Sequence, residues 1–246
     1  MKNKLIELEN KFTEIKKLGW IEASSHGNGN VGITFENMLG KERENFPIAD
    51  YNGIEIKTFI KGHGRPYITL FSSAPDGKYI FQTQILKEKY GKQDWKIKTF
   101  KVFYARITAN KFTKINNNYY MKLKIDYNRE KIFLEIYDLN FKLIEKDCYW
   151  DFTTIQNKIK QKLKYLAYIT AEKKFSHNKV YFRYIDINFY KIKNFKCFLQ
   201  LIAQRKIKIC FKVGIYRTKQ KLGKTYDHGT GFEIKKENIL ELYEKI

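Results

Sequence analysis

The stretch "GITFENMLGKERENFPIADYNGIEIKT" covers residues 32–58 and contains charged side chains in a suggestive order. Glu36 comes first, Asp50 follows, and Glu55 and Lys57 end the stretch two residues apart. Charged residues make up 30% of the chain, so short groupings of this kind also arise by chance. The stretch is therefore either a metal site that cleaves phosphodiester bonds or a coincidence of ordinary surface charges.

The segment "GIEIKTF" has the alternation of a β-strand. A period of two residues places Glu55 and Lys57 on the same face of this strand. Ile54, Ile56 and Ile60 share the other parity, which predicts a buried face. The alternative is an ordinary edge strand that exposes its glutamate and lysine to solvent.

Cleavage of a phosphodiester bond requires a divalent cation beside the phosphate, an activated water and neutralisation of the charge that develops in the transition state. Mg²⁺ prefers oxygen ligands and takes one or two carboxylates together with phosphate and water. The turn "YNG" can fold the Asp50 carboxylate back toward Glu55, and the Ile56 carbonyl can reach the same ion. Lys57 can then orient the water or stabilise charge on the phosphate.

The chain is strongly basic, which favours a polyanionic partner. It has 48 Lys and Arg against 26 Asp and Glu, a formal charge of +22, and a pI near 9.7. A globular chain of this charge usually meets nucleic acid, although the codon bias of an AT-rich genome also enriches lysine. The lysines are scattered and form no amphipathic membrane-binding segment.

The same composition argues against secretion and membrane insertion. No apolar run approaches the ~18 residues of a membrane span, and the N-terminus lacks the apolar core of a secretion signal. The three cysteines, Cys148, Cys197 and Cys210, lie far apart and show no zinc or disulfide spacing. We therefore expect a protein of the reducing cytoplasm.

Periodicity along the chain predicts a mixed α/β or α+β fold in one domain, with a sheet and helices before, between and after its strands. The closing segment "KENILELYEKI" is expected to be a helix, and "YYMKLKIDY" and "KIFLEIYD" are expected to form a hairpin around "NRE". The other expected elements are helices in 3–17, "ITFENMLG", "TTIQNKIKQKLKYL" and "FKCFLQLIAQRK", and strands in "YITLFSS", "YLAYITAEKK", "VYFRYIDI", "IKICFKVGIY" and "FEI".

The segment "GNGNVGITFENML…REN…ADYNGIEIKT" resembles the catalytic region of the MvaI/BcnI-type restriction endonucleases. It is more distantly similar to the MutH mismatch-repair nicking enzyme and to Sau3AI-type enzymes. The blocks "CYWDFTTIQNKIKQKLKYLAYITAEKK" (148–174) and "IKICFKVGIYR…GKTYDHGTGFEI" (207–234) resemble later parts of the MvaI-type enzymes, so the similarity spans most of the chain.

This resemblance implies a PD-(D/E)xK nuclease core, a mixed sheet flanked by helices, with a second lobe that closes on duplex DNA. Asp50 and Glu55 would bind Mg²⁺, with Mn²⁺ as a substitute, and the Ile56 carbonyl would assist. Lys57 would be the catalytic lysine, and Glu36 would lie beside it as a supporting or second-metal acid. Residues 1–246 would form one nuclease domain, with the catalytic lobe in roughly 1–110 and the hairpin and recognition lobe in 111–246. The enzyme would act as a monomer, with a separate companion DNA methyltransferase.

Two loops are candidates for contact with double-stranded DNA. The first, "FIKGHGRPY", follows the catalytic strand and offers Lys61, His63 and Arg65; His63 could contact a base or a phosphate, or be an exposed loop histidine. The second, "IYRTKQKLGKTYDHGTGFEI", combines lysines that suit phosphates with short polar side chains that suit base edges. Together with the preceding strand, it supplies Lys212, Arg217, Lys219, Lys221, Lys224, Thr225, Tyr226, Asp227, His228, Thr230 and Glu233.

Asp227 and Glu233 could each accept a hydrogen bond from cytosine N4, although an ordinary turn also explains the sequence Asp227-His228-Gly229. Similar enzymes carry histidine near Tyr226 and arginine near Lys212 and Glu233. Because a glutamate is not equivalent to an arginine that reads guanine, the CC-x-GG target of that family is not expected here.

The sequence therefore predicts a type II restriction endonuclease that hydrolyses double-stranded DNA at a short specific site. A MutH-like strand-nicking repair endonuclease is the closest alternative, and cleavage of unmethylated plasmid without helper proteins distinguishes the two. A non-catalytic DNA-binding protein is the alternative from another class. Loss of Asp50, Glu55 or Lys57 would have favoured that class, but all three are present.

Overall fold

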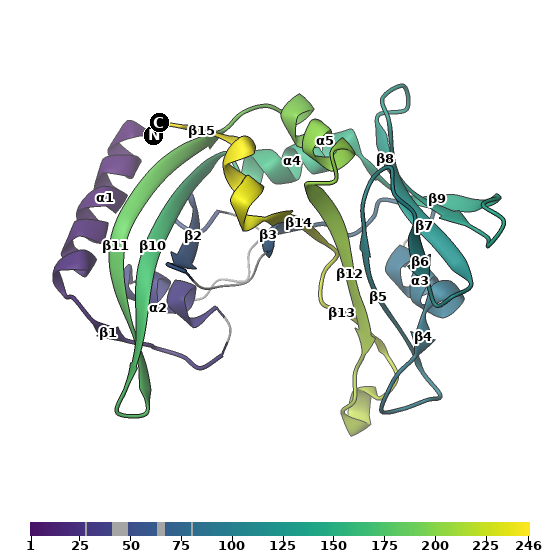
Figure 1. Cartoon of the computed structure of the whole chain (residues 1–246), viewed down its shortest axis with the longest axis horizontal. Helices are drawn as coiled ribbons and strands as arrows, with labels where there is room; N and C mark the ends of the chain where they lie inside the picture. Colours follow the sequence, from purple (N-terminus) through teal and green to yellow (C-terminus); the bar gives the residue numbers. More distant parts are fainter. Residues whose placement is uncertain (28, 41–48, 63–66, 80) are drawn as a thin grey trace. The chain divides into compact units, whose positions relative to one another are not determined.

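The computed structural model describes residues 1–27, 29–40, 49–62, 67–79 and 81–246. The chain forms two compact units that alternate along the sequence (Figure 1). Unit 1 consists of Met1–Pro66, Ile159–Lys193 and Tyr243–Ile246, and unit 2 consists of Tyr67–Lys158 and Asn194–Leu242. These boundaries differ from the division near residue 110 that the sequence suggested, because unit 1 is completed by segments from later in the chain.

Unit 1 contains a mixed sheet in the strand order β1-β11-β10-β2, with β15 paired to β11. The strand β2 runs parallel to β10, while the other pairs are antiparallel. Its strands are β1 (Ile21–Glu22), β2 (Glu55–Ile60), β10 (Tyr165–Ser176), β11 (Lys179–Ile192) and β15 (Tyr243–Lys245). Its N-terminal helices are α1 (Lys2–Lys17) and α2 (Asn30–Met38).

The core of unit 1 lies between this sheet and the helices α1 and α2, which cover one of its faces (Figure 1). Helix α1 contributes side chains at helical spacing and α2 contributes Val31 and Phe35. Ile54 and Ile56 enter the same core from the catalytic segment, as their parity predicted. Glu55 and Lys57 therefore lie on the opposite face of β2.

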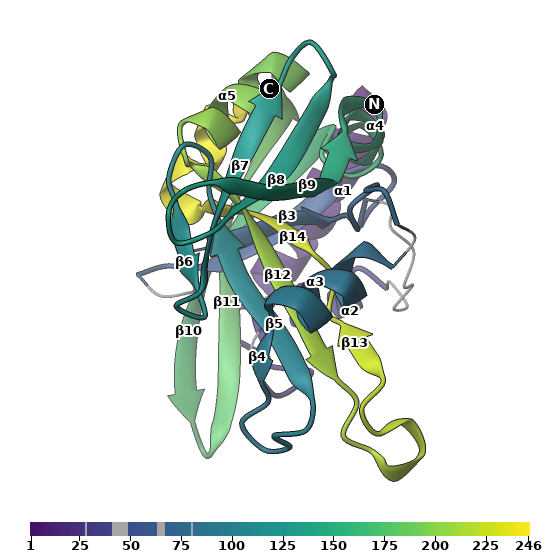
Figure 2. The ribbon, with the colours of Figure 1, turned by 90° about the vertical axis from the view of Figure 1, so that its right-hand side faces the viewer.

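The described residues of unit 2 form two sheets. The larger has the order β3-β14-β12-β5-β4 with β13 paired to β12, and the smaller has the order β6-β7-β8-β9. Figure 2 shows β5 and β12 running side by side. The strands are β3 (Tyr67–Ser72), β4 (Lys92–Gln93), β5 (Lys101–Ile107), β6 (Thr113–Ile115), β7 (Tyr119–Asp126), β8 (Lys131–Tyr137), β9 (Leu143–Asp151), β12 (Ile207–Ile215), β13 (Thr225–Asp227) and β14 (Gly231–Lys235).

The remaining helices lie between these strands along the chain. They are α3 (Gln82–Tyr90), α4 (Phe152–Lys162), α5 (Phe195–Ala203) and the short 3-10 helices η1 (Lys219–Lys221) and η2 (Lys236–Glu241). Helix α4 begins in unit 2 and ends in unit 1. Within the described residues, none of the helices has the length and apolar character needed to cross a membrane.

The mixed α+β architecture and the β7–β8 hairpin are confirmed. The helix expected in 236–246 is wrong: the segment forms η2 and then the strand β15, which pairs with β11. Burial of Ile239, Leu242 and Tyr243 explains why its apolar spacing looked helical. Helix α3 was not predicted from the sequence. Two of its buried residues, Gln82 and Lys87, are polar, so its buried side shows no stripe of apolar residues at helical spacing.

Candidate active site

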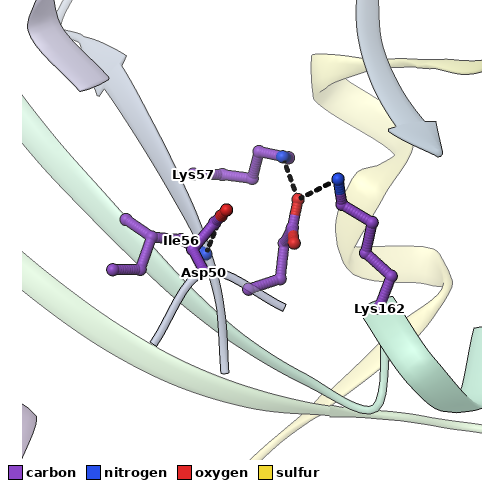
Figure 3. Close-up of polar contacts among 5 residues, drawn as sticks. Asp50, Ile56, Lys57 and Lys162 are labelled. Atoms are coloured by element: carbon purple, nitrogen blue, oxygen red, sulfur yellow. Dashed lines mark hydrogen bonds and ion pairs between the residues drawn. The ribbon is translucent and has the colours of Figure 1, made fainter. Parts of the chain in front are cut away.

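A tight turn brings Asp50 to the start of β2. Tyr51 and Ile54 exchange backbone hydrogen bonds of 2.9 and 2.7 Å across this turn. Asn52 and Gly53 adopt positive φ values of 48° and 90°, which glycine tolerates without steric cost. The Asp50 carboxylate consequently folds back, and its Oδ2 accepts a 2.9 Å hydrogen bond from the Ile56 N–H (Figure 3).

Glu55 is the buried acid of this cluster, with 0% of its surface exposed. Its Oε1 accepts a hydrogen bond from Lys57 Nζ and lies 3.8 Å from Lys162 Nζ (Figure 3). Its Oε2 is buried and has no hydrogen-bond partner among the described residues. The ion pair confirms that Glu55 and Lys57 share one face of β2, and the burial of Glu55 excludes the alternative of a solvent-exposed edge glutamate.

Burial and charge pull the pKa values of this pair in different directions. Burial raises the pKa of Glu55. The positive charges of Lys57 and Lys162 oppose that rise, and the negative charge of Asp50 adds to it. Burial alone would lower the pKa of Lys57, but the charges of Glu55, Asp50 and Glu36 outweigh it and raise that pKa overall. Lys57 is therefore an ammonium at neutral pH, able to donate hydrogen bonds but not to accept a proton.

Glu36 approaches this cluster from α2. Gly32 permits the close packing of α2 on β2, because a Cβ at this position would lie 3.1 Å from Thr58 Oγ1. The charge of Glu36 adds to the rise in the pKa of Lys57. It also adds to the rise in the pKa of Tyr184, for which burial is the larger cause. The charge of Glu36 thus acts on Lys57, while its role as a supporting or second-metal acid stays a prediction.

The oxygen atoms of this cluster suit a hard divalent cation. Asp50 and Glu55 supply two carboxylates, and the unpartnered Glu55 Oε2 is a ligand atom that nothing else in the described structure satisfies. No group of three or more His, Cys, Asp or Glu side chains with metal-binding geometry occurs in the described ranges. Two carboxylates are sufficient for Mg²⁺, which completes its shell with water and substrate phosphate.

Lys162 is a member of the cluster that sequence reasoning missed. It is the last residue of α4, and its side chain is 28% exposed. As one of 48 basic residues, it carries no local signal. Only the parallel pairing of β10 with β2, which places the end of α4 beside Glu55, identifies it.

The second group of DNA-binding candidates lies on unit 2, and four of its side chains form two contacting pairs. Lys212 Nζ donates a 2.8 Å hydrogen bond to Glu233 Oε1. The rings of Tyr226 and His228 meet edge to face with centroids 4.1 Å apart. Thr225 is half-buried and Thr230 is buried, whereas Tyr226 is exposed.

Other candidates have structural partners or lie outside the description. Asp227 Oδ1 accepts a 2.8 Å hydrogen bond from the Gly229 N–H, so the ordinary-turn alternative accounts for part of its role. Lys224 donates its backbone N–H to the Lys221 carbonyl at 3.0 Å. Lys61 is exposed, while His63 and Arg65 lie outside the described residues.

Arg217 Nη2 donates a 2.6 Å hydrogen bond to Asp94 Oδ2. The other oxygen of this buried aspartate accepts the N–H groups of Lys96 and Ile97 at 3.1 and 3.0 Å. In this structure Arg217 therefore holds the loop after β4, and its predicted contact with DNA stays a prediction.

Asp94→Asn is expected to lower the melting temperature most at neutral pH. Burial would raise the pKa of Asp94, but hydrogen bonds from Ile97, Arg217 and Lys96 lower it overall. A carboxyl group whose pKa is lower in the folded than in the unfolded state stabilises the fold at every pH above its unfolded-state pKa. This stability is lost as the pH falls through its folded-state pKa. Melting curves from neutral to acidic pH should thus show the difference between parent and variant shrinking with acidity. A pH-independent difference would contradict the ionic role.

Known restriction endonucleases resemble this chain in sequence and in fold. The model of the MvaI/BcnI restriction endonuclease family matches residues 9–243, which include Asp50, Glu55 and Lys57. The restriction endonuclease MvaI in complex with its cognate DNA substrate is 32% identical, with a TM-score of 0.87, covering 100% of this chain and 98% of that chain. MvaI in the absence of DNA has the same identity and coverage with a TM-score of 0.67. A search among curated proteins gave no match.

Proposed function

Because this chain belongs to the MvaI/BcnI restriction endonuclease family and is a type II restriction endonuclease, we propose that Asp50, Glu55 and Lys57 form its Mg²⁺-dependent catalytic centre. The observation that carries this proposal is the Glu55 carboxylate, which is buried and held by Lys57 through one oxygen, while its other oxygen has no partner among the described residues. A buried charged oxygen without a hydrogen bond is costly unless a ligand satisfies it.

Asp50, Glu55 Oε2 and the Ile56 carbonyl would hold the ion, which when bound supplies positive charge beside the scissile phosphate and lowers the pKa of a bound water. Lys57 donates hydrogen bonds as an ammonium, so it orients the attacking water and stabilises the charge that develops on the phosphate. Glu36 balances the positive charge of Lys57, and Lys162 holds Glu55 Oε1 together with Lys57. Mn²⁺ is expected to be able to substitute for Mg²⁺ at this site.

Double-stranded DNA is the proposed substrate. The formal charge of +22 suits a polyanion, and the similar MvaI structure is a complex with cognate DNA. Phosphates would be contacted by Lys61, Arg65, Arg217 and Lys224, and base edges would be read by His63, Thr225, Tyr226, Asp227, His228, Thr230 and the Lys212–Glu233 pair. Action as a monomer in the cytoplasm and a companion methyltransferase are further predictions from the family resemblance.

Digestion of a methylation-free genome with the purified protein and Mg²⁺ tests this function. Sequencing of the fragment ends should reveal one short site with cuts at a fixed position in both strands. Nicks in one strand only would favour the MutH-like alternative, and DNA left intact under all conditions would refute the nuclease proposal.

Lys162→Ala is expected to move the acid limb of the pH–rate profile to higher pH. Lys162 opposes the rise in the pKa of Glu55, so its removal lets Glu55 take up a proton at higher pH, where it can no longer serve as an anionic ligand. Rates at alkaline pH should change less. The matched control is Lys160→Ala, an exposed lysine on the same helix; identical profiles for the two variants would remove Lys162 from the site.

A further inference from the structure

The larger sheet of unit 2 has one apolar and one polar face. Ile107, Ile209, Phe211 and Ile234 point into the core and are at most 1% exposed. The opposite parity of the strands presents a polar face that is rich in cations and aromatic rings. This reading face, as we call it, contains Tyr67, Thr69, Tyr104, Arg106, Lys208, Lys212, Tyr226 and Glu233.

Glu233 is the exception on this otherwise basic face. It is 4% exposed, and its Oε1 accepts the 2.8 Å hydrogen bond from Lys212. Its Oε2 has no hydrogen-bond partner among the residues that the structure describes. Arg106 Nε is 3.6 Å from this oxygen, close enough for charge attraction but too far for a hydrogen bond. Within the described part of the chain, Glu233 therefore has one satisfied oxygen and one that still lacks a donor.

A phosphate ligand does not explain this arrangement. A carboxylate among cations weakens their attraction for phosphates and repels the phosphates directly. Base edges differ, because in the major groove the amino groups of cytosine (N4) and adenine (N6) are hydrogen-bond donors. On a DNA-binding surface, an acid with a free oxygen therefore fits an exocyclic amino group.

We propose that Glu233 Oε2 accepts a hydrogen bond from the exocyclic amino group of one base of the target site, while Lys212 and Arg106 donate to acceptor atoms beside it. The proposal rests on the proposed function and names one determinant of its specificity. Arg106 is 61% exposed at its side chain, so it can move from Oε2 to the DNA. No sequence pattern pointed to Arg106, since this residue lies outside both candidate loops.

The order of the three side chains bears on which base is read. Lys212 flanks one carboxylate oxygen and Arg106 the other, giving donor, acceptor and donor. An A·T pair presents acceptor, donor and acceptor across the major groove (adenine N7, adenine N6 and thymine O4), which complements all three. A C·G pair places both acceptors of guanine on one side of cytosine N4, so it would engage Glu233 and the cation on that side. Both base pairs present the exocyclic amino group that Glu233 requires.

The competing interpretation is that Glu233 only orients Lys212 and Arg106 toward phosphates. Removal of the carboxylate would then weaken binding to all sequences equally. If Glu233 reads a base, its removal should instead reduce discrimination at one position of the site. This difference makes a specificity profile, rather than an affinity, the decisive measurement.

The protein-side test compares Glu233→Gln and Glu233→Ala with the parent on a set of duplexes. The set carries the mapped target site with every single base-pair substitution. Discrimination should fall by about 10- to 100-fold at one position and stay within a factor of about two elsewhere. The control is Glu237→Gln, which makes the same charge change at an exposed residue next to β14. Melting temperatures verify that each variant is folded.

The DNA-side test uses the unaltered protein and therefore does not depend on folding of a variant. Each adenine of the site is replaced by purine and each cytosine by pyrimidin-2-one, one position at a time, to delete the amino group. Binding without metal and cleavage with Mg²⁺ are both measured. We expect the amino-group deletion at one position to reduce binding and cleavage by about 10-fold or more. The sensitive position should be an adenine-to-purine replacement if Glu233 reads an A·T pair, and a cytosine-to-pyrimidin-2-one replacement if it reads a C·G pair.

The outcomes separate this proposal from the function on which it rests. Unchanged profiles for Glu233→Gln and Glu233→Ala, or a uniform loss at all positions, would overturn the assignment of Glu233 while leaving the nuclease intact. So would equal tolerance of every amino-group deletion. Failure of the parent to cut any DNA would instead refute the proposed function.

Discussion

Glu55→Gln is expected to reduce Mg²⁺-dependent DNA cleavage by about 10³-fold or more. A catalytic metal contributes several kcal/mol to the transition state, and each ~1.4 kcal/mol is a factor of ten in rate. Glutamine keeps the size of Glu55 but offers a neutral oxygen to a hard cation, which prefers carboxylate. Single-turnover cleavage of a plasmid that carries one target site measures the effect.

A second measurement links that loss to the metal. Mg²⁺ that binds the folded protein stabilises it by RT ln(1 + [Mg²⁺]/Kd), about 1.4 kcal/mol at ten times Kd. The parent should therefore melt at a higher temperature with Mg²⁺, while Glu55→Gln should gain little. Glu22→Gln is the control, because Glu22 is an exposed acid of unit 1 that pairs with Lys179. An equal Mg²⁺-dependent shift in Glu55→Gln would remove Glu55 from the metal site.

The local part of the catalytic cluster could be predicted from the sequence because short-range geometry determines it. Strand periodicity places Glu55 and Lys57 on one face, and a tight turn returns Asp50 to the start of the strand. Both features occur within eight residues, so no knowledge of the rest of the fold is needed. The same reasoning identified the hairpin of β7 and β8, in which the turn and both strands are contiguous.

The parts that could not be predicted depend on contacts between distant segments. Lys162 reaches Glu55 because α4 ends where β10 begins to pair with β2, about a hundred residues from Glu55 in the chain. Arg106 lies beside Glu233 only because β5 and β14 both pair with β12. The strand β15 forms because Tyr243 and its neighbours pair with β11, which overrides the helical spacing of the last residues.

Lys57→Ala is expected to reduce cleavage by about 10²–10³-fold while leaving DNA binding nearly intact. The lysine is charged at neutral pH because the surrounding acids raise its pKa above the level that burial would set. It therefore acts on charge that develops in the transition state, and loss of one such donor costs about 10²–10³-fold in kcat. Binding to the target duplex, measured for parent and variant without metal, should change by less than about threefold. Lys17→Ala, an exposed lysine at the end of α1, provides the control.

The variant also separates two interpretations of the Glu55–Lys57 ion pair. If Lys57 served only to hold Glu55 in place, Lys57→Arg would restore cleavage, because arginine also pairs with a carboxylate. If it acts on the phosphate or the water, the wider guanidinium cannot take the position of the ammonium, and activity should stay low. The pairing of Glu55 Oε1 with Lys162 as well as Lys57 favours the second interpretation, since Glu55 keeps one cation when Lys57 is lost. Full activity in Lys57→Arg would therefore reduce Lys57 to a positioning residue, and cleavage by Lys57→Ala at the parental rate would remove it from the catalytic centre.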